Sequence, residues 1–299
     1  MNGTGASPKI LLTGCAGQLG RELKRSLACL GELHACDRHQ LDLANADTLR
    51  ATLHALAPTV IVNAAAYTAV DKAENDQATA DAINARAPGI LAEEAMRSGA
   101  MLIHFSTDYV FDGTKSTAYT EDDTPAPLSA YGRSKLAGEL AIAASGARHL
   151  IFRTSWVYGL HGANFMKTML RLGRRSCETG DELRVIGDQV GAPTWTRHLA
   201  DVTVAALARR DGPEGLYHLA AGGETSWHGY AEAIFAEAQG IGLMETKPVV
   251  RRITSADYPL PAGRPANSRL DCAKFQRDFK LALPDWRIGL ADCLADSRF

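Results

Sequence analysis

The chain has 299 residues, of which 46% are hydrophobic and 22% are charged, a composition typical of a folded globular protein. Its formal net charge of −2 argues against a protein that binds nucleic acid by neutralising phosphates. The six cysteines form no C-x-x-C pair, no apolar stretch is long enough to span a membrane, and no signal peptide is visible. We therefore expect reduced thiols and a cytoplasmic protein with no nucleic-acid or membrane partner.

The first predicted element is a strand, turn and helix near the N-terminus. An apolar run, Ile10–Leu12, precedes glycines spaced G-x-x-G-x-x-G at Gly14, Gly17 and Gly20, and helically spaced leucines follow over residues 21–30. Glycines permit a tight turn and a close approach of the backbone, and the helix then offers free N–H groups to a pyrophosphate. At the start of a βα unit this pattern favours dinucleotide binding over a purely structural turn.

A second predicted strand, residues 33–37, ends in the carboxylate of Asp37. In nucleotide-binding units an acid about 20 residues beyond the glycines bonds the ribose hydroxyls of adenosine. Asp37 has this spacing, although a solvated turn residue would also explain it. Arg38 and His39 follow immediately and could contact a ribose phosphate, so the sequence leaves the choice between NADH and NADPH open.

Strands and helices continue to alternate after Asp37. A β-branched run over residues 58–66 is typical of a strand buried on both faces, and another apolar run over residues 101–113 breaks into polar residues at Ser106. Helical segments are predicted between and beside these strands, at residues 45–56, 77–87 and 89–98. Because no hairpin signal separates the strands, the elements predict an α/β fold with a doubly wound parallel sheet of Rossmann type.

Ligands of such a sheet gather at the carboxyl ends of its strands. Gly14, Asp37, Asn63–Ala66 and Thr107 all fall at predicted strand ends. Their agreement carries more weight than any single residue, and it predicts one site at this edge of the sheet.

A helix predicted from Ser129 onward carries Tyr131 and Lys135 about one turn apart on the same face. Reduction of a ketone needs a hydride at the carbonyl carbon and an acid at its oxygen. An unperturbed tyrosine has a pKa of about 10, and a neighbouring ammonium is expected to lower it toward the useful range. Thr107 can donate a hydrogen bond to the same oxygen. An ordinary surface helix would explain the Tyr-x-x-x-Lys spacing alone, but the glycine-rich start of the chain favours the catalytic interpretation.

The second half of the chain has a looser pattern. Strands are predicted at residues 149–158 and 216–220, helices at 164–174, 197–209 and 226–238, and an irregular segment at 248–270. We expect residues 1–157 to form an NAD(P)-binding Rossmann domain. Residues 158–299 are expected to form a smaller substrate-binding region, of which about 185–222 returns to pack on the first domain.

Several motifs together resemble those of the extended short-chain dehydrogenase/reductases. They are Thr13–Gly20, Asn63–Asp71, Ser106–Asp112 and Tyr131–Lys135. Within that superfamily, three further segments resemble the dTDP-4-dehydrorhamnose reductases: Arg153–Tyr158, Asp188–Thr194 and Arg264–Asp271. The resemblance runs from about Lys9 to the C-terminus and implies reduction of dTDP-4-dehydro-β-L-rhamnose to dTDP-β-L-rhamnose by NADPH or NADH, the last step of dTDP-rhamnose synthesis.

The resemblance also implies residue roles. Tyr131 protonates the C4 oxygen, Lys135 orients the nicotinamide ribose and tunes the tyrosine, and Thr107 holds the carbonyl oxygen. The implied cofactor contacts are Gly14, Gly17, Gln18 and Leu19 at the pyrophosphate, Asp37, Asp42 and Leu43 around the adenosine, and Ala64, Ala65, Ala66 and Tyr67 on the nicotinamide side. The implied contacts of the dTDP-sugar are Thr107, Asp108 and Trp156, with Arg264, Asn267 and Ser268 at the diphosphate. An ordinary core aromatic is the alternative interpretation of Trp156.

One position departs from the family pattern. Some members bridge two subunits with magnesium through two carboxylates, and Glu22 fits the first position while Arg197 occupies the second. An arginine cannot ligate a cation. We therefore predict no metal site and a monomer or weak homodimer that is not metal-bridged.

Two alternatives stay open. An epimerase or dehydratase of the same superfamily would use the same Thr107, Tyr131 and Lys135 but regenerate its cofactor in each cycle. A non-catalytic NAD(P)-binding regulatory subunit would belong to another functional class. Such a module has no chemical need for a tuned tyrosine, which argues against it.

Overall fold

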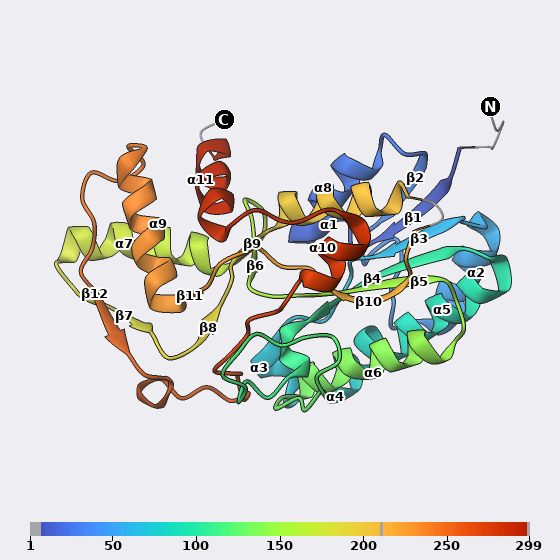
Figure 1. Ribbon diagram of the computed structural model, residues 1–299, viewed down its shortest axis with the longest axis horizontal. Coiled ribbons are helices and arrows are strands. Elements are labelled where there is room, and N and C mark those ends of the chain that lie inside the picture. The colour runs from blue at the N-terminus through green and yellow to red at the C-terminus, as the bar shows by residue number, and fades with distance from the viewer. Residues whose placement is uncertain (1–6, 210–211, 298–299) are drawn as a thin grey trace.

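Parallel strands form the central sheet of the computed structural model, which describes residues 7–209 and 212–297 (Figure 1). The six strands lie in the order β10-β5-β4-β3-β1-β2. Their bounds are β1 Lys9–Thr13, β2 Glu32–Cys36, β3 Val60–Asn63, β4 Met101–Thr107, β5 His149–Thr154 and β10 Gly215–His218. The strand order runs outward in both directions from the β1–β3 pair, so the predicted α/β doubly wound sheet of Rossmann type is confirmed.

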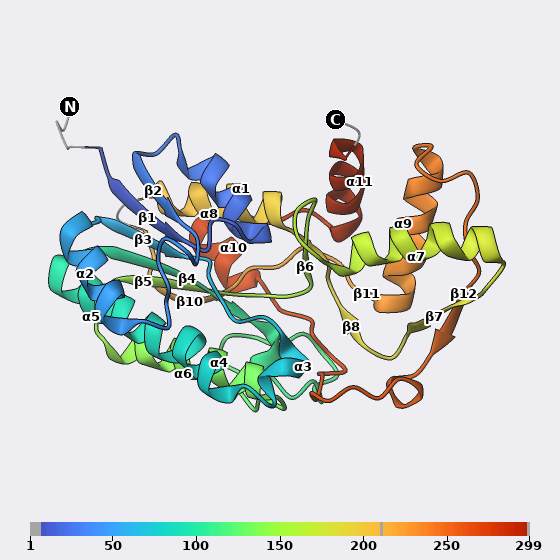
Figure 2. The same ribbon diagram turned by 180° about the vertical axis from the view of Figure 1, so that it is seen from behind.

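Helices cover both faces of this sheet, as the two opposite views show (Figures 1 and 2). One layer contains α1 Gln18–Leu27, α8 Thr196–Leu207 and α10 Ala273–Phe279; the other contains α2 Ala46–Leu56, α5 Ala87–Ser98 and α6 Ala130–Ala144. Successive side chains of a strand point to opposite faces. Ile10 and Leu12 accordingly pack in the first layer, whereas Leu11 packs in the second. Because both faces are buried, the strands read as unbroken apolar runs.

The predicted helices are present with shifted ends. The helix after the glycines begins three residues earlier than its leucine pattern, at Gln18, because Gly17 is its N-cap. The segment predicted as a helix over residues 77–87 consists of α4 Gln77–Asp81 and a π-helical turn, Ala82–Arg86, that runs directly into α5. Short helical turns also follow β3 and β4, namely α3 Val70–Ala73 and a 3-10 turn at Asp108–Val110.

A smaller lobe lies beyond the carboxyl ends of the strands (Figure 1). Its core is built by α7 Phe165–Thr179, α9 Trp227–Gly240 and α11 Trp286–Asp296. Short strand pairs complete the lobe and its connection to the sheet: β7 Leu183–Ile186 with β12 Val250–Ile253, β6 Val157–Tyr158 with β9 Thr194–Trp195, and β8 Val190–Gly191 with β11 Thr225–Ser226. The segment over residues 248–270, predicted to be irregular, therefore begins with a strand.

Three elements from the second half of the chain return to the sheet. β10 pairs with β5 in parallel, α8 packs against α1, and α10 packs in the same layer beside β10. The domain limits at residues 157 and 158 stay a prediction. In the part of the chain that the structure describes, every helix is too short or too polar to cross a bilayer.

Candidate active site

The glycine turn between β1 and α1 requires its glycines. Gly14 has a φ of +70°, and a Cβ built on it would lie 2.7 Å from the backbone of Ala65. A Cβ on Gly20 would overlap the carbonyl group of Gly14. Gly17 is exposed and caps α1 without any side-chain hydrogen bond, so the first N–H groups of this helix point outward from the turn. This geometry fits the pyrophosphate of a dinucleotide.

The two residues that follow Gly17 have different surroundings. The Gln18 side chain accepts a hydrogen bond from Asn164 Nδ2 at 2.8 Å and donates one to the Ala163 carbonyl at 3.4 Å. Leu19 packs against the first core layer. Gln18 thus ties the glycine turn to the loop that precedes α7.

A cavity of about 530 Å³ lies beside this turn, at the end of β2. Asp37 lines it, and the Asp37 carboxylate accepts hydrogen bonds from the backbone N–H groups of His39 and Gln40, which lower its pKa. Basic side chains share the lining: Arg21, Lys24, Arg25 and Arg197. The cavity therefore offers the Asp37 carboxylate to the hydroxyls of a free ribose and basic side chains to a phosphorylated ribose. Beyond it, the Asp42 carboxylate accepts a hydrogen bond from Ala44 N, and Leu43 is buried in the core.

The segment Ala64–Tyr67 follows β3 and is fixed by a residue that the sequence did not reveal. Asn84, fully buried in the π-helical turn, accepts a hydrogen bond from Tyr67 N at 2.8 Å. Its amide nitrogen donates to the Tyr67 carbonyl and to Ser134 Oγ of α6, both at 3.0 Å. Ala65 touches the glycine turn on the other side. The glycine turn, this segment and α6 are thus held as one unit.

Thr107, Tyr131 and Lys135 meet at the carboxyl edge of the sheet. Thr107 is the buried last residue of β4, and Ser129 caps α6 by accepting a hydrogen bond from Gly132 N at 3.1 Å. This cap places Tyr131 and Lys135 in the first two turns of α6. The Tyr131 phenol hydrogen-bonds the Thr107 side chain, and its ring stands edge-on to Tyr109 with centroids 5.6 Å apart.

The expectation that Lys135 lowers the pKa of Tyr131 is wrong in this structure. Burial raises the pKa of Tyr131 to about 12, and only the Thr107 hydrogen bond opposes that rise. The Lys135 ammonium is directed elsewhere: it donates to the Phe105 carbonyl at 2.7 Å and lies 3.1 Å from His104 Nε2. Burial lowers the pKa of Lys135 itself to about 8, although Glu139 opposes the shift.

Four of the polar residues expected at the dTDP-sugar fall into two groups of two: Asp108 with Ser268, and Arg264 with Asn267. Asp108 and Ser268 are buried close together, and burial raises the pKa of Asp108 to about 6 against the opposing hydrogen bonds of Ser268 and Thr107. The polar atoms of the other two already have protein partners. Arg264 forms a two-point ion pair with Asp71, at 2.7 and 3.0 Å, and Asn267 donates to the Lys115 and Thr117 carbonyls, both at 2.7 Å. Their predicted diphosphate contacts stay predictions.

Trp156 lies at the break between β5 and β6 with a φ of +48°, an unusual conformation for a non-glycine residue. Its indole stacks on Trp227 with ring centroids 3.6 Å apart and planes 8° from parallel. Trp227 is the first residue of α9, 71 positions further along the chain, and nothing in the sequence pattern pairs the two. The partly exposed pair joins the sheet to the smaller lobe.

At the position where the family pattern includes a metal ligand, the structure has an ion-pair cluster. Arg197 Nε lies 3.1 Å from Glu22 Oε2, and Arg197 also pairs with Asp296 of α11. Across residues 7–209 and 212–297, His, Cys, Asp and Glu side chains do not gather in threes as a metal site requires. The prediction of no metal therefore stays untested.

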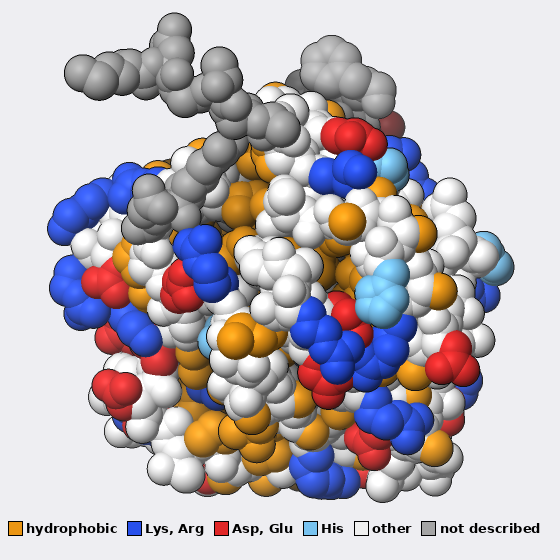
Figure 3. Space-filling model, turned by 90° about the vertical axis from the view of Figure 1, so that its right-hand side faces the viewer, with side chains coloured by type: hydrophobic (Ala, Val, Ile, Leu, Met, Phe, Trp, Pro, Cys, Tyr) orange, Lys and Arg blue, Asp and Glu red, His pale blue; other side chains and the backbone are white. Residues whose placement is uncertain are grey.

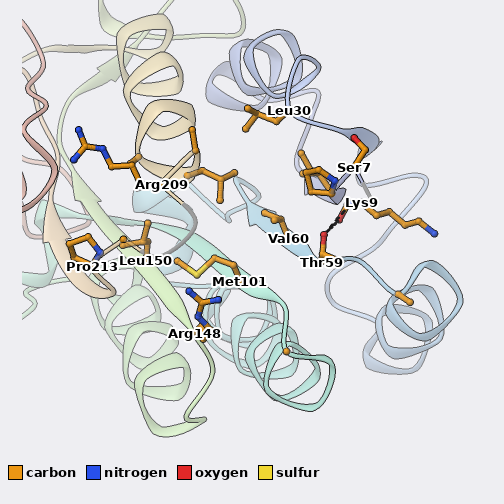
Figure 4. Close-up of a pocket in the computed structure, with 18 residues that line it drawn as sticks. Ser7, Lys9, Leu30, Thr59, Val60, Met101, Arg148, Leu150, Arg209 and Pro213 are labelled. Carbon is orange, nitrogen blue, oxygen red and sulfur yellow. Dashed lines mark hydrogen bonds between the residues drawn. The ribbon is translucent and has the colours of Figure 1, made fainter. Parts of the chain in front are cut away.

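A larger cavity, of about 570 Å³, lies at the opposite edge of the sheet. Figure 3 faces this end of the molecule, where apolar side chains show between charged ones, and Figure 4 shows Val60, Met101 and Leu150 among the lining residues. None of the predicted site residues lines it.

Comparison with known proteins gives a consistent result. Residues 8–299 match the family described as RmlD substrate binding domain. A dTDP-4-dehydrorhamnose reductase from Burkholderia thailandensis is 47% identical over 96% of this chain and 98% of its own length, and one from Shigella flexneri is 48% identical over 94% and 95%. A crystal structure of dTDP-4-dehydrorhamnose reductase from Bacillus anthracis in complex with NADP is 33% identical, has a TM-score of 0.89, and covers 97% of this chain and 99% of its own.

Proposed function

The chain belongs to the dTDP-4-dehydrorhamnose reductase family, and on this premise we propose that it reduces the C4 ketone of dTDP-4-dehydro-β-L-rhamnose to give dTDP-β-L-rhamnose. The cofactor is NADPH or NADH, as the NADP complex of the Bacillus anthracis relative supports. The observation that carries the proposal is the arrangement of the buried Thr107 and Lys135 and the half-buried Tyr131 at the end of the sheet where Gly14 and Gly20 leave no room for a Cβ. A module that only binds a nucleotide has no use for this group.

NADPH or NADH, held by the glycine turn, Asp37 and the segment Ala64–Tyr67, would supply the hydride that the C4 carbon needs. Tyr131 supplies the proton that the C4 oxygen needs, and its raised pKa keeps the phenol protonated at neutral pH, which is the form an acid requires. An alkoxide is a far stronger base than a phenolate, so the transfer remains favourable. Thr107 holds the carbonyl oxygen by a hydrogen bond. We assign the Lys135 ammonium to the nicotinamide ribose, because two of its three N–H bonds are directed to β4 and one is left.

The cofactor residues have graded support. We propose that the N–H groups after Gly17, with Gln18 and Leu19, hold the pyrophosphate in the turn that Gly14 permits, and that Asp37 holds the ribose hydroxyls. Asp42 and Leu43 shape the turn beside the adenosine. Ala64, Ala65, Ala66 and Tyr67 form the segment that would lie against the nicotinamide, with Tyr131 and Lys135 at its ribose.

For the dTDP-sugar we assign Thr107 and Asp108 to the keto sugar and Trp156 to one sugar face, where an indole suits apolar C–H groups. Ser268 lies beside Asp108. Arg264 and Asn267 complete the proposed set, but each would have to give up a protein partner to bind a diphosphate. Their contribution is therefore expected to be the smallest.

We further propose a cytoplasmic monomer or weak homodimer without a bridging metal. The Arg197–Glu22 pair supports this, because the guanidinium supplies at that carboxylate the positive charge that a cation would supply. All six thiols are free, as in a reducing compartment. A chelator added during sizing chromatography should leave the elution volume unchanged, and a dimer that dissociates on chelation would refute the proposal. The division at residues 157 and 158 can be tested by limited proteolysis.

The function is tested by incubating the protein with dTDP-4-dehydro-6-deoxyglucose, a 3,5-epimerase and either reduced cofactor while following the nicotinamide absorbance. We expect cofactor oxidation in proportion to substrate and only when the epimerase is present. An epimerase or dehydratase would convert the keto sugar without net cofactor consumption. Binding of cofactor without turnover would favour the regulatory subunit.

A further inference from the structure

A row of buried polar side chains crosses three strands beneath the proposed active site. Thr13 of β1 is paired with Asn63 of β3, and Asn63 is paired with His104 of β4, so the three side chains point to the same face of the sheet. Thr13 Oγ1 lies 2.7 Å from Asn63 Oδ1, and the Asn63 amide nitrogen lies 3.0 Å from His104 Nδ1. All three are at most 1% exposed. Buried polar groups require such partners.

Lys135 ends this row. Its Nζ lies 3.1 Å from His104 Nε2 and donates to the Phe105 carbonyl at 2.7 Å, while the side chain is 1% exposed. An ammonium has three N–H bonds. Two are directed to β4 by these contacts, which leaves one for the nicotinamide ribose. His104 is therefore one of the two groups that aim Lys135.

The hydrogen count along the row limits how His104 can bond. A neutral imidazole carries one N–H, so one ring nitrogen donates and the other accepts. An ammonium has no lone pair, so a charged Lys135 can only donate to Nε2, and Nδ1–H then donates to the Asn63 amide oxygen. This arrangement requires the Asn63 amide to be turned over from the orientation in which its nitrogen faces His104 Nδ1 and its oxygen faces Thr13. An uncharged Lys135 amine has both N–H bonds and a lone pair, so it is compatible with either imidazole tautomer.

A protonated imidazole is excluded from this row. Burial, and then the charge of Lys135, hold the pKa of His104 well below its usual range. The ionisable side chains on the strands and turn packed against this end of α6 are His104, Asp108, Tyr109 and Arg153. Besides Lys135, those on α6 itself are Tyr131, Glu139 and Arg133, which is exposed and pairs with Glu74. Arg153 and Glu139 pair with each other at 2.6 Å. On α3, α4, α5 and the π-helical turn, all wholly described, the one buried ionisable side chain is Glu94, which pairs with Arg50, His54 and Arg97.

We propose that His104 is a positioning residue that holds Lys135 as a correctly aimed ammonium by accepting its hydrogen bond at Nε2. This inference rests on the proposed role of Lys135 in the reductase. It deepens that role, because the ammonium that orients the nicotinamide ribose then depends on a side chain that touches neither cofactor nor substrate.

The test compares His104→Leu with His104→Gln. Leucine removes both ring nitrogens, whereas glutamine can place an amide oxygen near the Nε2 position. We expect kcat of His104→Leu to fall by about 10- to 100-fold, because misplacement by a fraction of an ångström is that costly. Its alkaline pH limb should move about one unit lower, because the ammonium loses an acceptor that favours it. His104→Gln should recover most of kcat and the wild-type limb. A merely structural residue would lower activity without moving the limb, and that outcome would overturn the proposal.

A measurement on the unmodified protein covers the case in which His104→Leu does not fold. With 15N-labelled histidine, the His104 proton should sit on Nδ1 at every pH below the alkaline limb. A proton on Nε2 at a pH where the enzyme is active would refute the inference. If the wild-type protein fails to oxidise either cofactor with the keto sugar, the proposed function is wrong instead, and the 15N spectrum still decides the His104–Lys135 pairing.

Discussion

The carboxyl and amino edges of the central sheet differ in the side chains that line them. At the carboxyl edge, Thr13, Asn63, His104 and Lys135 are buried and hydrogen-bonded to one another. At the amino edge, a cavity of about 570 Å³ is lined largely by apolar residues, with Lys9, Arg148 and Arg209 among the others (Figure 4). The larger hollow is thus not the place where reactive groups gather.

The difference follows from parallel topology. Every strand of the sheet runs in the same direction, so all the loops that lead into helix N-termini meet at one edge. Helix N-termini carry unsatisfied N–H groups and a positive partial charge, which anionic cofactors need. The amino edge has neither advantage. Two residues before each member of the polar row, on the same face of the sheet, lie three residues of the hydrophobic core: Leu11, Ile61 and Leu102.

The largest expected effect is at Tyr131. Tyr131→Phe should lower kcat by about 1,000-fold or more, because it removes the acid that protonates the C4 oxygen. Cofactor affinity should stay within about twofold, because the glycine turn and the lysine are intact. Turnover assays with cofactor titration by fluorescence check both numbers. Loss of cofactor binding would mean that Tyr131 is structural and that the carboxyl edge has been misinterpreted.

A smaller loss is expected at Thr107. Thr107→Val keeps the shape of the side chain but removes the hydroxyl, and we expect kcat to fall by about 100-fold. Thr107→Ser is the matched control because it restores the hydroxyl, and it should recover most of the activity. Equal losses in the two variants would assign the effect to packing at the end of β4 rather than to the hydrogen bond.

The pH dependence of the wild-type enzyme should be bell-shaped. The pKa of Lys135 is lowered to about 8, so above that pH the ammonium is lost and kcat/KM should fall up to tenfold per unit. The pKa of Asp108 is raised to about 6, so below that pH the carboxylate is protonated and loses the charge that strengthens a hydrogen bond from the sugar. Asp108→Asn should remove the acid limb and leave the alkaline one. An acid limb that persists in this variant would have to come from another group.

Much of this carboxyl edge could be predicted from sequence because its signals are local. The glycine spacing, the apolar strands and the Tyr-x-x-x-Lys pair each lie within a few residues, and parallel topology brings their ends together. The structure brings Tyr131 to Thr107, and Lys135 reaches His104 and Phe105 on the same strand. The parts of the site that the sequence does not predict depend on the register between strands that are far apart in the chain. His104 reads as one residue of an apolar strand, and only the pairing of β1, β3 and β4 aligns it with Thr13 and Asn63.

The failures have physical causes. The direction of the Tyr131 pKa depends on burial and on where the Lys135 amine points, and neither is encoded in a four-residue spacing. The Asn84 turn was hidden because a π-helical turn continues the helical pattern on both sides. The Trp156–Trp227 stack could not be predicted because the two residues are far apart in the chain and meet only where the sheet joins the smaller lobe. Strand β12, in a proline-rich segment, lacks the length and alternation that a pattern detects.

The smallest effect is expected at the amino edge, where it tests whether this edge has empty space and takes no part in catalysis. Val60 and Val62 lie two residues apart on the same face of β3, but Val60 lines the cavity whereas Val62 is fully buried. Val60→Ile adds one methylene toward empty space, so the free energy of unfolding should rise by up to ~0.8 kcal/mol with turnover unchanged. Val62→Ile adds the same group to a packed core and should cost ~1–3 kcal/mol. Urea unfolding of both variants measures the difference. If Val60→Ile were destabilising to the same degree, the cavity would not have room for the added group. If it changed kcat, the amino edge would influence catalysis.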